Sequence, residues 1–178
     1  MKKIMFTLLA TCAICVTAQA SAVDWQFTTR STSTAAVGGT AYLILGAAGT
    51  YATVDDVIAA SVDNASMVAN GSKLVTNPQT WDTATGEVGS TASFSIVLVD
   101  SGATGYYVAA TGLTGTYYDP TDALTQKPTA ISQTVSTAIT ASSMTSFSGG
   151  SGGGVPEPTS GLLLLVGAGM LALRRKQK

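Results

Sequence analysis

Two apolar runs, one near each end of the chain, confine the part that can form a folded body. Residues 4–16 and 161–173 each form a run of 13 residues. Lys2 and Lys3 precede the first run, and a basic cluster follows the second. Runs with these flanks are typical of segments that enter a membrane rather than a protein core. We therefore expect the folded body between them, over residues 23–140.

Residues 1–22 have the three parts of a secretory signal peptide. A basic start and an apolar run are followed by two small-x-small sites, which end at Ala20 and Ala22. We expect signal peptidase to cut after one of these two alanines. Either cut removes both cysteines of the chain, because Cys12 and Cys15 lie in the apolar run. The mature protein is then predicted to contain no thiol and no disulfide.

Residues 155–178 combine a short motif, an apolar run and a basic end. The motif before the run is Pro156, Glu157 and Pro158. The basic stop after it begins with Arg174, Arg175 and Lys176. As a helix the run would span roughly 20 Å, against a bilayer core of about 30 Å. We expect a short transmembrane anchor whose basic end stays in the cytoplasm, with the body on the other side of the membrane.

This tail resembles the PEP-CTERM sorting signal of diderm bacteria. The resemblance rests on the Pro156–Glu157–Pro158 motif, the short helix rich in Leu and Gly, and the basic end. It implies that an exosortase-type enzyme processes the tail. It further implies that the body is held at the inner membrane on the periplasmic side, and then reaches the cell surface or the extracellular matrix.

Residues 141–154 are rich in serine and glycine and show no periodic apolar pattern. This composition is typical of a flexible linker. We therefore expect a tether between the body and the sorting tail.

The body itself has the pattern of a mainly β protein. Residues 93–99 alternate, which places Phe94, Ile96 and Leu98 on one face of a strand. Turn residues at 100–105 and a second strand at 106–110 predict a hairpin. Further strands are expected at 25–29, 40–45 and 115–118. Residues 131–139 alternate as a strand but also fit helical spacing, so their type stays open.

One helix is predicted in the body. Thr53 is a good N-cap, and Asp56 completes a capping box. The helical face would contain Val54, Val57, Ile58 and Val62, and the helix would end at 63–64 or 70–71. The expected architecture is a small β-sandwich with one short helix, flanked by a signal peptide and a transmembrane tail.

The residue types of the chain restrict its chemistry. It contains no histidine, which excludes Ser-His and Cys-His nucleophiles and histidine-bound metals. Residues 23–154 carry three basic and nine acidic side chains, a net charge of −6, which disfavours nucleic acid as a partner. The aspartates occur in turn-like contexts and show no metal-binding loop. We predict no catalytic residue, no metal and no cofactor.

Three functions fit these observations. The first is an exported, non-catalytic structural protein of the cell surface or matrix. The second is a carbohydrate-binding module that retains exopolysaccharide, with Trp81 and Tyr107 as a stacking platform. The third is a secreted hydrolase that uses carboxylates. A serine hydrolase is disfavoured, because the G-x-S-x-G match at 149–153 lies in a linker and the chain has no histidine to activate its serine.

Overall fold

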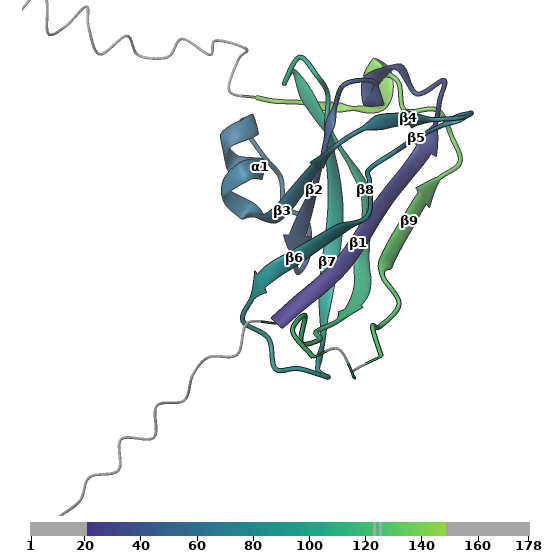
Figure 1. The fold of residues 1–178 in the computed structure, drawn as a ribbon. Coiled ribbons are helices and arrows are strands. Elements are labelled where there is room, and N and C mark those ends of the chain that lie inside the picture. The colour runs from purple at the N-terminus through teal and green to yellow at the C-terminus, as the bar shows by residue number, and fades with distance from the viewer. Residues whose placement is uncertain (1–20, 123, 125, 149–178) are drawn as a thin grey trace, which may run out of the picture.

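The alternating segment predicted at 93–99 forms strand β7 (Thr91–Val99), the central strand of one sheet in a β-sandwich (Figure 1). This computed structural model describes residues 21–122, 124 and 126–148. Most of the predicted signal peptide and the whole sorting tail lie outside the described residues, so their predictions are not tested by the fold.

The first sheet, called the helix-side sheet, is antiparallel and has the order β10-β8-β7-β2-β3. Its other strands are β2 (Thr40–Leu45), β3 (Ser61–Ser66), β8 (Gly105–Thr116) and β10 (Thr145–Ser146). The predicted hairpin is confirmed, because β7 pairs with β8 and Val99 faces Tyr106 next to the turn.

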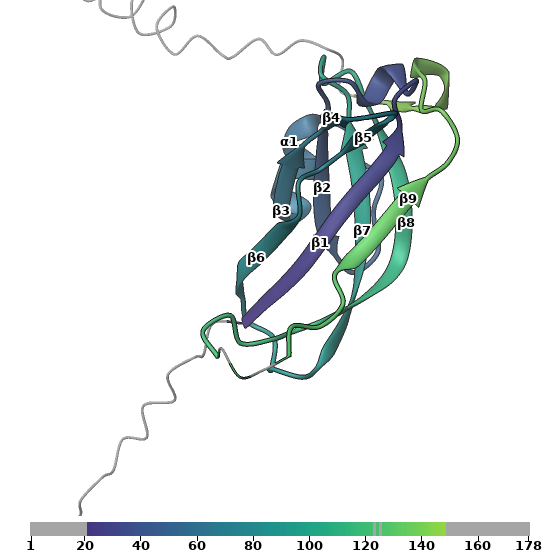
Figure 2. The same ribbon diagram turned by 45° about the vertical axis from the view of Figure 1, so that its right-hand side comes forward.

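The second sheet, called the β1 sheet, is built around β1 (Ser21–Arg30). Its other strands are β4 (Val68–Asn70), β5 (Lys73–Val75), β6 (Gln79–Ala84) and β9 (Ile131–Val135). Strands β5 and β6 pair antiparallel with successive parts of β1, whereas β9 runs parallel to it, with Trp25 opposite Ile131. Figure 2 shows β9 and β6 on opposite sides of β1. The ambiguous segment 131–139 is therefore a strand over its first five residues.

The main core lies between the two sheets. Phe94, Ile96 and Leu98 are fully buried there, as the alternation of the sequence predicted. Trp25 and Phe27 reach the same core from β1 and have no exposed surface. The apolar side chains of each strand are thus removed from water on the face that meets the other sheet.

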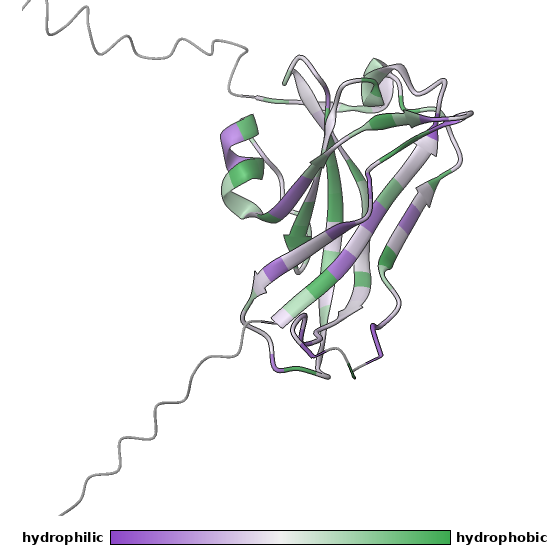
Figure 3. Ribbon diagram, viewed as in Figure 1, coloured by the Kyte–Doolittle hydropathy of each residue, from purple (hydrophilic) through white to green (hydrophobic). Residues whose placement is uncertain are grey.

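A second core covers the outer face of the helix-side sheet. Tyr42, Val97 and Tyr106 point to this face, where Tyr51 and Val57 pack against them. This explains why residues 40–45 are apolar at successive positions: both faces of β2 are covered. In Figure 3 apolar segments of the helix accordingly lie beside the sheet.

The helix α1 (Val54–Ala60) begins as predicted and ends earlier than predicted. The Thr53 side chain accepts from the N–H of Asp56, and the Asp56 carboxylate accepts from the N–H of Thr53. The predicted end at 63–64 or 70–71 is wrong, because the chain turns extended at Ser61 and pairs as β3 with β2. Val62 therefore packs against the main core from a strand instead of continuing the helical face.

The folded body is longer at both ends than the predicted 23–140. Ser21 and Ala22 belong to β1 and are fully buried. Beyond Thr140, the 3-10 helix η2 (Ala141–Ser143) leads into β10, and the Phe147 ring lies 5.4 Å from that of Tyr106. A linker beginning at 141 is therefore wrong, because Thr145 and Ser146 pair with β8 and Phe147 covers the second core.

The two ends of the described chain lie at opposite ends of the sandwich. Figures 1 and 2 show β1 starting at one end and the last described residues at the other, which is also the end that carries the short 3-10 helix η1 (Thr34–Ala36). None of the helices among the described residues has the length and apolar character that crossing a bilayer requires.

Candidate functional site

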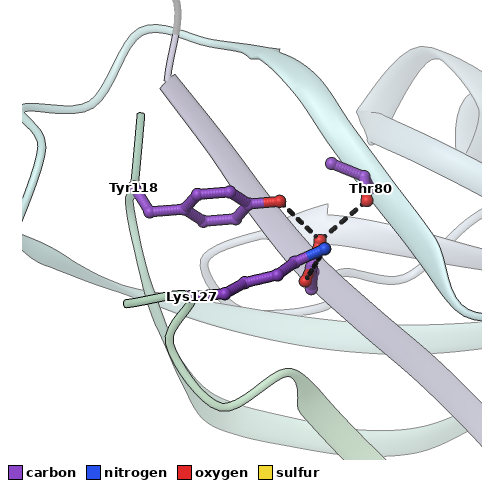
Figure 4. A network of polar contacts seen from close by, with 4 residues as sticks. Thr80, Tyr118 and Lys127 are labelled. Carbon is purple, nitrogen blue, oxygen red and sulfur yellow. Dashed lines mark hydrogen bonds and ion pairs between the residues drawn. The ribbon is translucent and has the colours of Figure 1, made fainter. Parts of the chain in front are cut away.

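The carboxylate of Asp24 is the centre of a polar network that joins distant parts of the body. Even-numbered residues of β1 alternate away from the main core, which brings Asp24 to the outer face of the β1 sheet. The hydroxyls of Thr80 and Tyr118 donate to Asp24 Oδ1 at 2.7 and 2.8 Å, and Lys127 Nζ lies 2.8 Å from Oδ2 (Figure 4). Three segments far apart in the sequence thus meet at one carboxylate.

The contacts within this network fix the protonation states of its ionisable side chains. Burial acts to raise the pKa of Asp24, but the hydrogen bonds from Lys127, Thr80 and Tyr118 together outweigh it and lower that pKa. The hydrogen bond to Asp24 raises the pKa of Lys127. Burial, with the adjacent carboxylate, raises the pKa of the Tyr118 phenol. At neutral pH the group is therefore a carboxylate, an ammonium and a neutral phenol.

This arrangement supports a structural role better than a chemical one. A carboxylate of lowered pKa is a weak general base, and a protonated lysine is no nucleophile. Tyr118 and Lys127 lie at the two ends of the connection between β8 and β9, so the network fastens that connection to β1. The ammonium also lies 5.5 Å from the centre of the Tyr118 ring.

Other carboxylates of the body organise turns, as their sequence contexts predict. Asp100 Oδ1 accepts from the N–H groups of Thr104 and Gly105 at 2.8 and 2.9 Å, which shapes the β7–β8 loop. Burial acts to raise the pKa of Asp100, but these N–H groups together with the Thr104 hydroxyl and the N–H of Gly102 outweigh it and lower that pKa. Asp119 accepts from the N–H of Thr121 in the next loop. Among the described residues, no three side chains of the His, Cys, Asp and Glu types gather as metal ligands.

The two residues predicted as a glycan platform lie in different sheets. Trp81 is half-buried on β6, packs edge-to-face on Phe94 at 6.2 Å and donates from Nε1 to Thr83. Tyr107 is half-buried on β8 and packs against the main core. The structure therefore gives both rings a packing role and does not place them on one stacking surface.

The paired tyrosines point to opposite faces and are largely covered on both. Tyr106 enters the second core, where its hydroxyl accepts from the N–H of Tyr51 at 3.3 Å, while Tyr107 turns to the main core. Tyr117 packs in the main core, and Tyr118 reaches Asp24. The burial of these aromatic side chains therefore supports a role in packing the cores rather than in stacking against a glycan.

The Asp24 network was not among the sites predicted from sequence. Asp24 and Lys127 are separated by almost the whole body, and Thr80 is one of many threonines in strands. The one available signal was the alternation of β1, which places Asp24 among its polar positions and so predicts an outward carboxylate but not its partners.

Comparison with known proteins locates a functional signal outside the described residues. The family model of the PEP-CTERM protein-sorting motif matches residues 154–177, which include Pro156, Glu157 and Pro158 as well as Arg174, Arg175 and Lys176. No curated protein and no solved structure matches the chain. The chain thus carries a PEP-CTERM sorting motif, as the resemblance of its tail predicted, and the motif implies recognition by an exosortase-type processing enzyme.

Proposed function

We propose that this carrier of a PEP-CTERM sorting motif is a non-catalytic structural protein of the cell surface or extracellular matrix. The motif itself implies an exported protein that is transiently anchored in the membrane. The observation that carries the proposal is the position of the motif, which starts at residue 154, shortly after the last described residue of the folded body. The body is then the exported part of the protein, and the tail is the sorting signal that directs it.

The side chains of the body support a role without catalysis. The chain has no histidine, and both cysteines precede residue 21. The carboxylates of Asp24, Asp56 and Asp100 are occupied by hydrogen bonds within the fold. A glycoside hydrolase would instead need a pair of carboxylates with distinct protonation states facing one cleft.

Strand β1 also supports one of the two predicted cleavage sites. The N–H of Ala22 donates to the carbonyl of Tyr118 at 2.8 Å, and the N–H of Tyr118 donates back to Ala22 at 3.0 Å. The Ser21 hydroxyl donates to the carbonyl of Ala84 at 3.1 Å. A cut after Ala20 keeps all these bonds in the mature protein, whereas a cut after Ala22 removes them.

The sorting function is tested by moving the tail. Residues 149–178 are fused to a neutral exported reporter in a host that has an exosortase, and the reporter is expected beyond the inner membrane in processed form. The matched variant replaces Pro156, Glu157 and Pro158 by alanine and is expected to stay unprocessed in the inner membrane. Normal processing of the triple-alanine reporter would show that the motif is not what the enzyme recognises.

A further inference from the structure

A hollow opens at the end of the β1 sheet where β1, β5 and β9 meet. Its volume is about 400 Å³, within the range of small-ligand sites. It is lined by Arg30, Ser31, Ser72, Lys73, Thr134 and Ser136, among others. It lies apart from the Asp24 network, which is centred on the opposite half of β1.

Two positively charged side chains line this hollow, and neither forms an ion pair with a carboxylate of the described residues. Arg30 and Lys73 are direct partners in the antiparallel pairing of β1 with β5, so both side chains lie on the same face. Like charges at such positions repel each other. Among the described residues the only ion pair of a lysine or arginine is that of Lys127 with Asp24, so neither Arg30 nor Lys73 has an acidic partner there.

The concentration of these cations is unusual for this chain. Residues 23–154 contain three basic side chains, and two of them line the same hollow. Repulsion between them is relieved when an anion binds between them. Arginine is suited to this task because its guanidinium can bind a carboxylate or phosphate through two parallel hydrogen bonds.

The rest of the lining is rich in hydroxyl groups. Every lining residue except Arg30, Lys73 and Val135 is a serine or a threonine. Hydroxyls both donate and accept hydrogen bonds, as do the hydroxyls of a sugar ring. The hollow therefore combines a cation pair for one acidic group with several partners for neutral polar groups.

We infer that this hollow binds a sugar acid, with its carboxylate between Arg30 and Lys73 and its ring hydroxyls on the serine and threonine side chains. A short acidic saccharide fits better than a continuous anionic surface, because the body carries a net charge of −6 that repels membranes and nucleic acid. The inference goes beyond the proposed function and does not depend on processing of the tail.

The test uses the full chain in a neutral detergent, with trigalacturonate and the neutral trimer galactotriose as probes in isothermal titration calorimetry. Trigalacturonate is expected to bind, and the neutral trimer is not. Inorganic phosphate is the third probe, which presents an oxyanion without ring hydroxyls. Affinity for trigalacturonate is expected to fall as salt is raised from about 0.05 M to about 0.5 M, since exposed charges are screened.

Arg30→Gln and Lys73→Gln are each expected to weaken trigalacturonate binding about fivefold, the effect of one exposed ion pair worth roughly 1 kcal/mol. The double variant should show no binding. Lys127→Gln removes a cation elsewhere in the fold and is the matched control, which should keep the affinity of the unchanged chain. Thermal unfolding of each variant confirms that it is folded.

Four results would overturn the inference. These are no binding of trigalacturonate, equal binding of the acidic and neutral trimers, unchanged binding in the double variant, and phosphate binding as tight as that of trigalacturonate. The last result would reduce the site to a bare oxyanion site. Normal processing of the tail alongside any of them would leave the proposed sorting function intact.

Discussion

The indole Nε1 of Trp25 donates a hydrogen bond to Asp63 Oδ2 at 2.7 Å, and this contact joins the two sheets of the sandwich. Trp25 lies on β1 and is fully buried, while Asp63 lies on β3 at the edge of the helix-side sheet. A buried indole N–H needs a partner, so Asp63 allows a large aromatic side chain to fill the main core without an unpaired donor.

Replacement of Asp63 by alanine is expected to lower the free energy of unfolding by about 1–3 kcal/mol, because the buried indole N–H loses its acceptor. Urea unfolding followed by tryptophan fluorescence measures this change. Asp82→Ala, at an exposed position of β6, is the control and should change stability by less than about 0.5 kcal/mol. Equal effects of the two changes would contradict the role given to Asp63.

The Asp24 network predicts a specific loss of stability in acid. The pKa of Asp24 is lowered in the folded state, so its contribution is complete above the pKa of the unfolded chain and is lost as pH falls below about 4. Asp24→Asn should therefore reduce unfolding free energy by about 1 kcal/mol at pH 7 and by little at pH 2. Chemical unfolding at both pH values measures the difference.

The same network has an alkaline limit. The pKa of Lys127 is raised in the folded state, so its contribution is complete below its usual pKa and is lost as pH rises through the raised value. Lys127→Gln is expected to be slightly less stable than the unchanged chain at pH 7. In strongly alkaline solution, where Lys127 is neutral, the two proteins should be equally stable. A stability loss that is the same at every pH would mean that the ion pair does not contribute.

Gly115 is predicted to tolerate no side chain. A Cβ atom there would lie 2.7 Å from Ile131 Cδ1 and 2.8 Å from Phe94 Cε2, inside the main core. Gly115→Ala should lower the free energy of unfolding by about 1–3 kcal/mol through overpacking. Gly49→Ala is the control, because no atom lies within 4 Å of its Cβ position. Thermal unfolding of the two variants should separate them clearly.

The mature protein is expected to begin at Ser21. Intact-mass measurement of the exported protein tests this, and a first residue of Val23 would contradict it. Ala18→Trp disrupts the Ala18–Gln19–Ala20 site alone and leaves the Ala20–Ser21–Ala22 site intact, so it should force the cut after Ala22. That shortened protein should be less stable by about 1–2 kcal/mol, because the Ser21 and Ala22 hydrogen bonds to Ala84 and Tyr118 are lost.

Local patterns explain which parts of the fold were predictable. The β7–β8 hairpin is encoded by the alternation of Phe94, Ile96 and Leu98 and by a turn-forming loop next to it. The start of α1 is encoded in the four residues of the capping box. Its end is not local: Val62 fits a helical face as well as a strand, and only the pairing of β3 with β2 decides between them.

The second core and the polar sites depended on contacts distant in sequence. Serine and glycine dominate the segment after Thr140, so composition suggested a linker and hid the role of Phe147 on Tyr106. Similarly, Arg30 and Lys73 become neighbours only through the register of β1 with β5. A single sequence contains no local signal for that register.

The opposite placement of the two ends of the body has a consequence for export. Strand β1, with ten residues, is about 33 Å long, and only residues 149–153 separate the last described residue from the sorting motif. The twelve residues 149–160 between the last described residue and the second apolar run reach at most about 43 Å, which exceeds the length of β1. While both apolar runs are held in the same bilayer as proposed, the sandwich stays tethered to the membrane at both of its ends. Cleavage after Ala20 frees the end where β1 starts and leaves the tail, at the opposite end, as the single tether, so that the start of β1 can point away from the membrane.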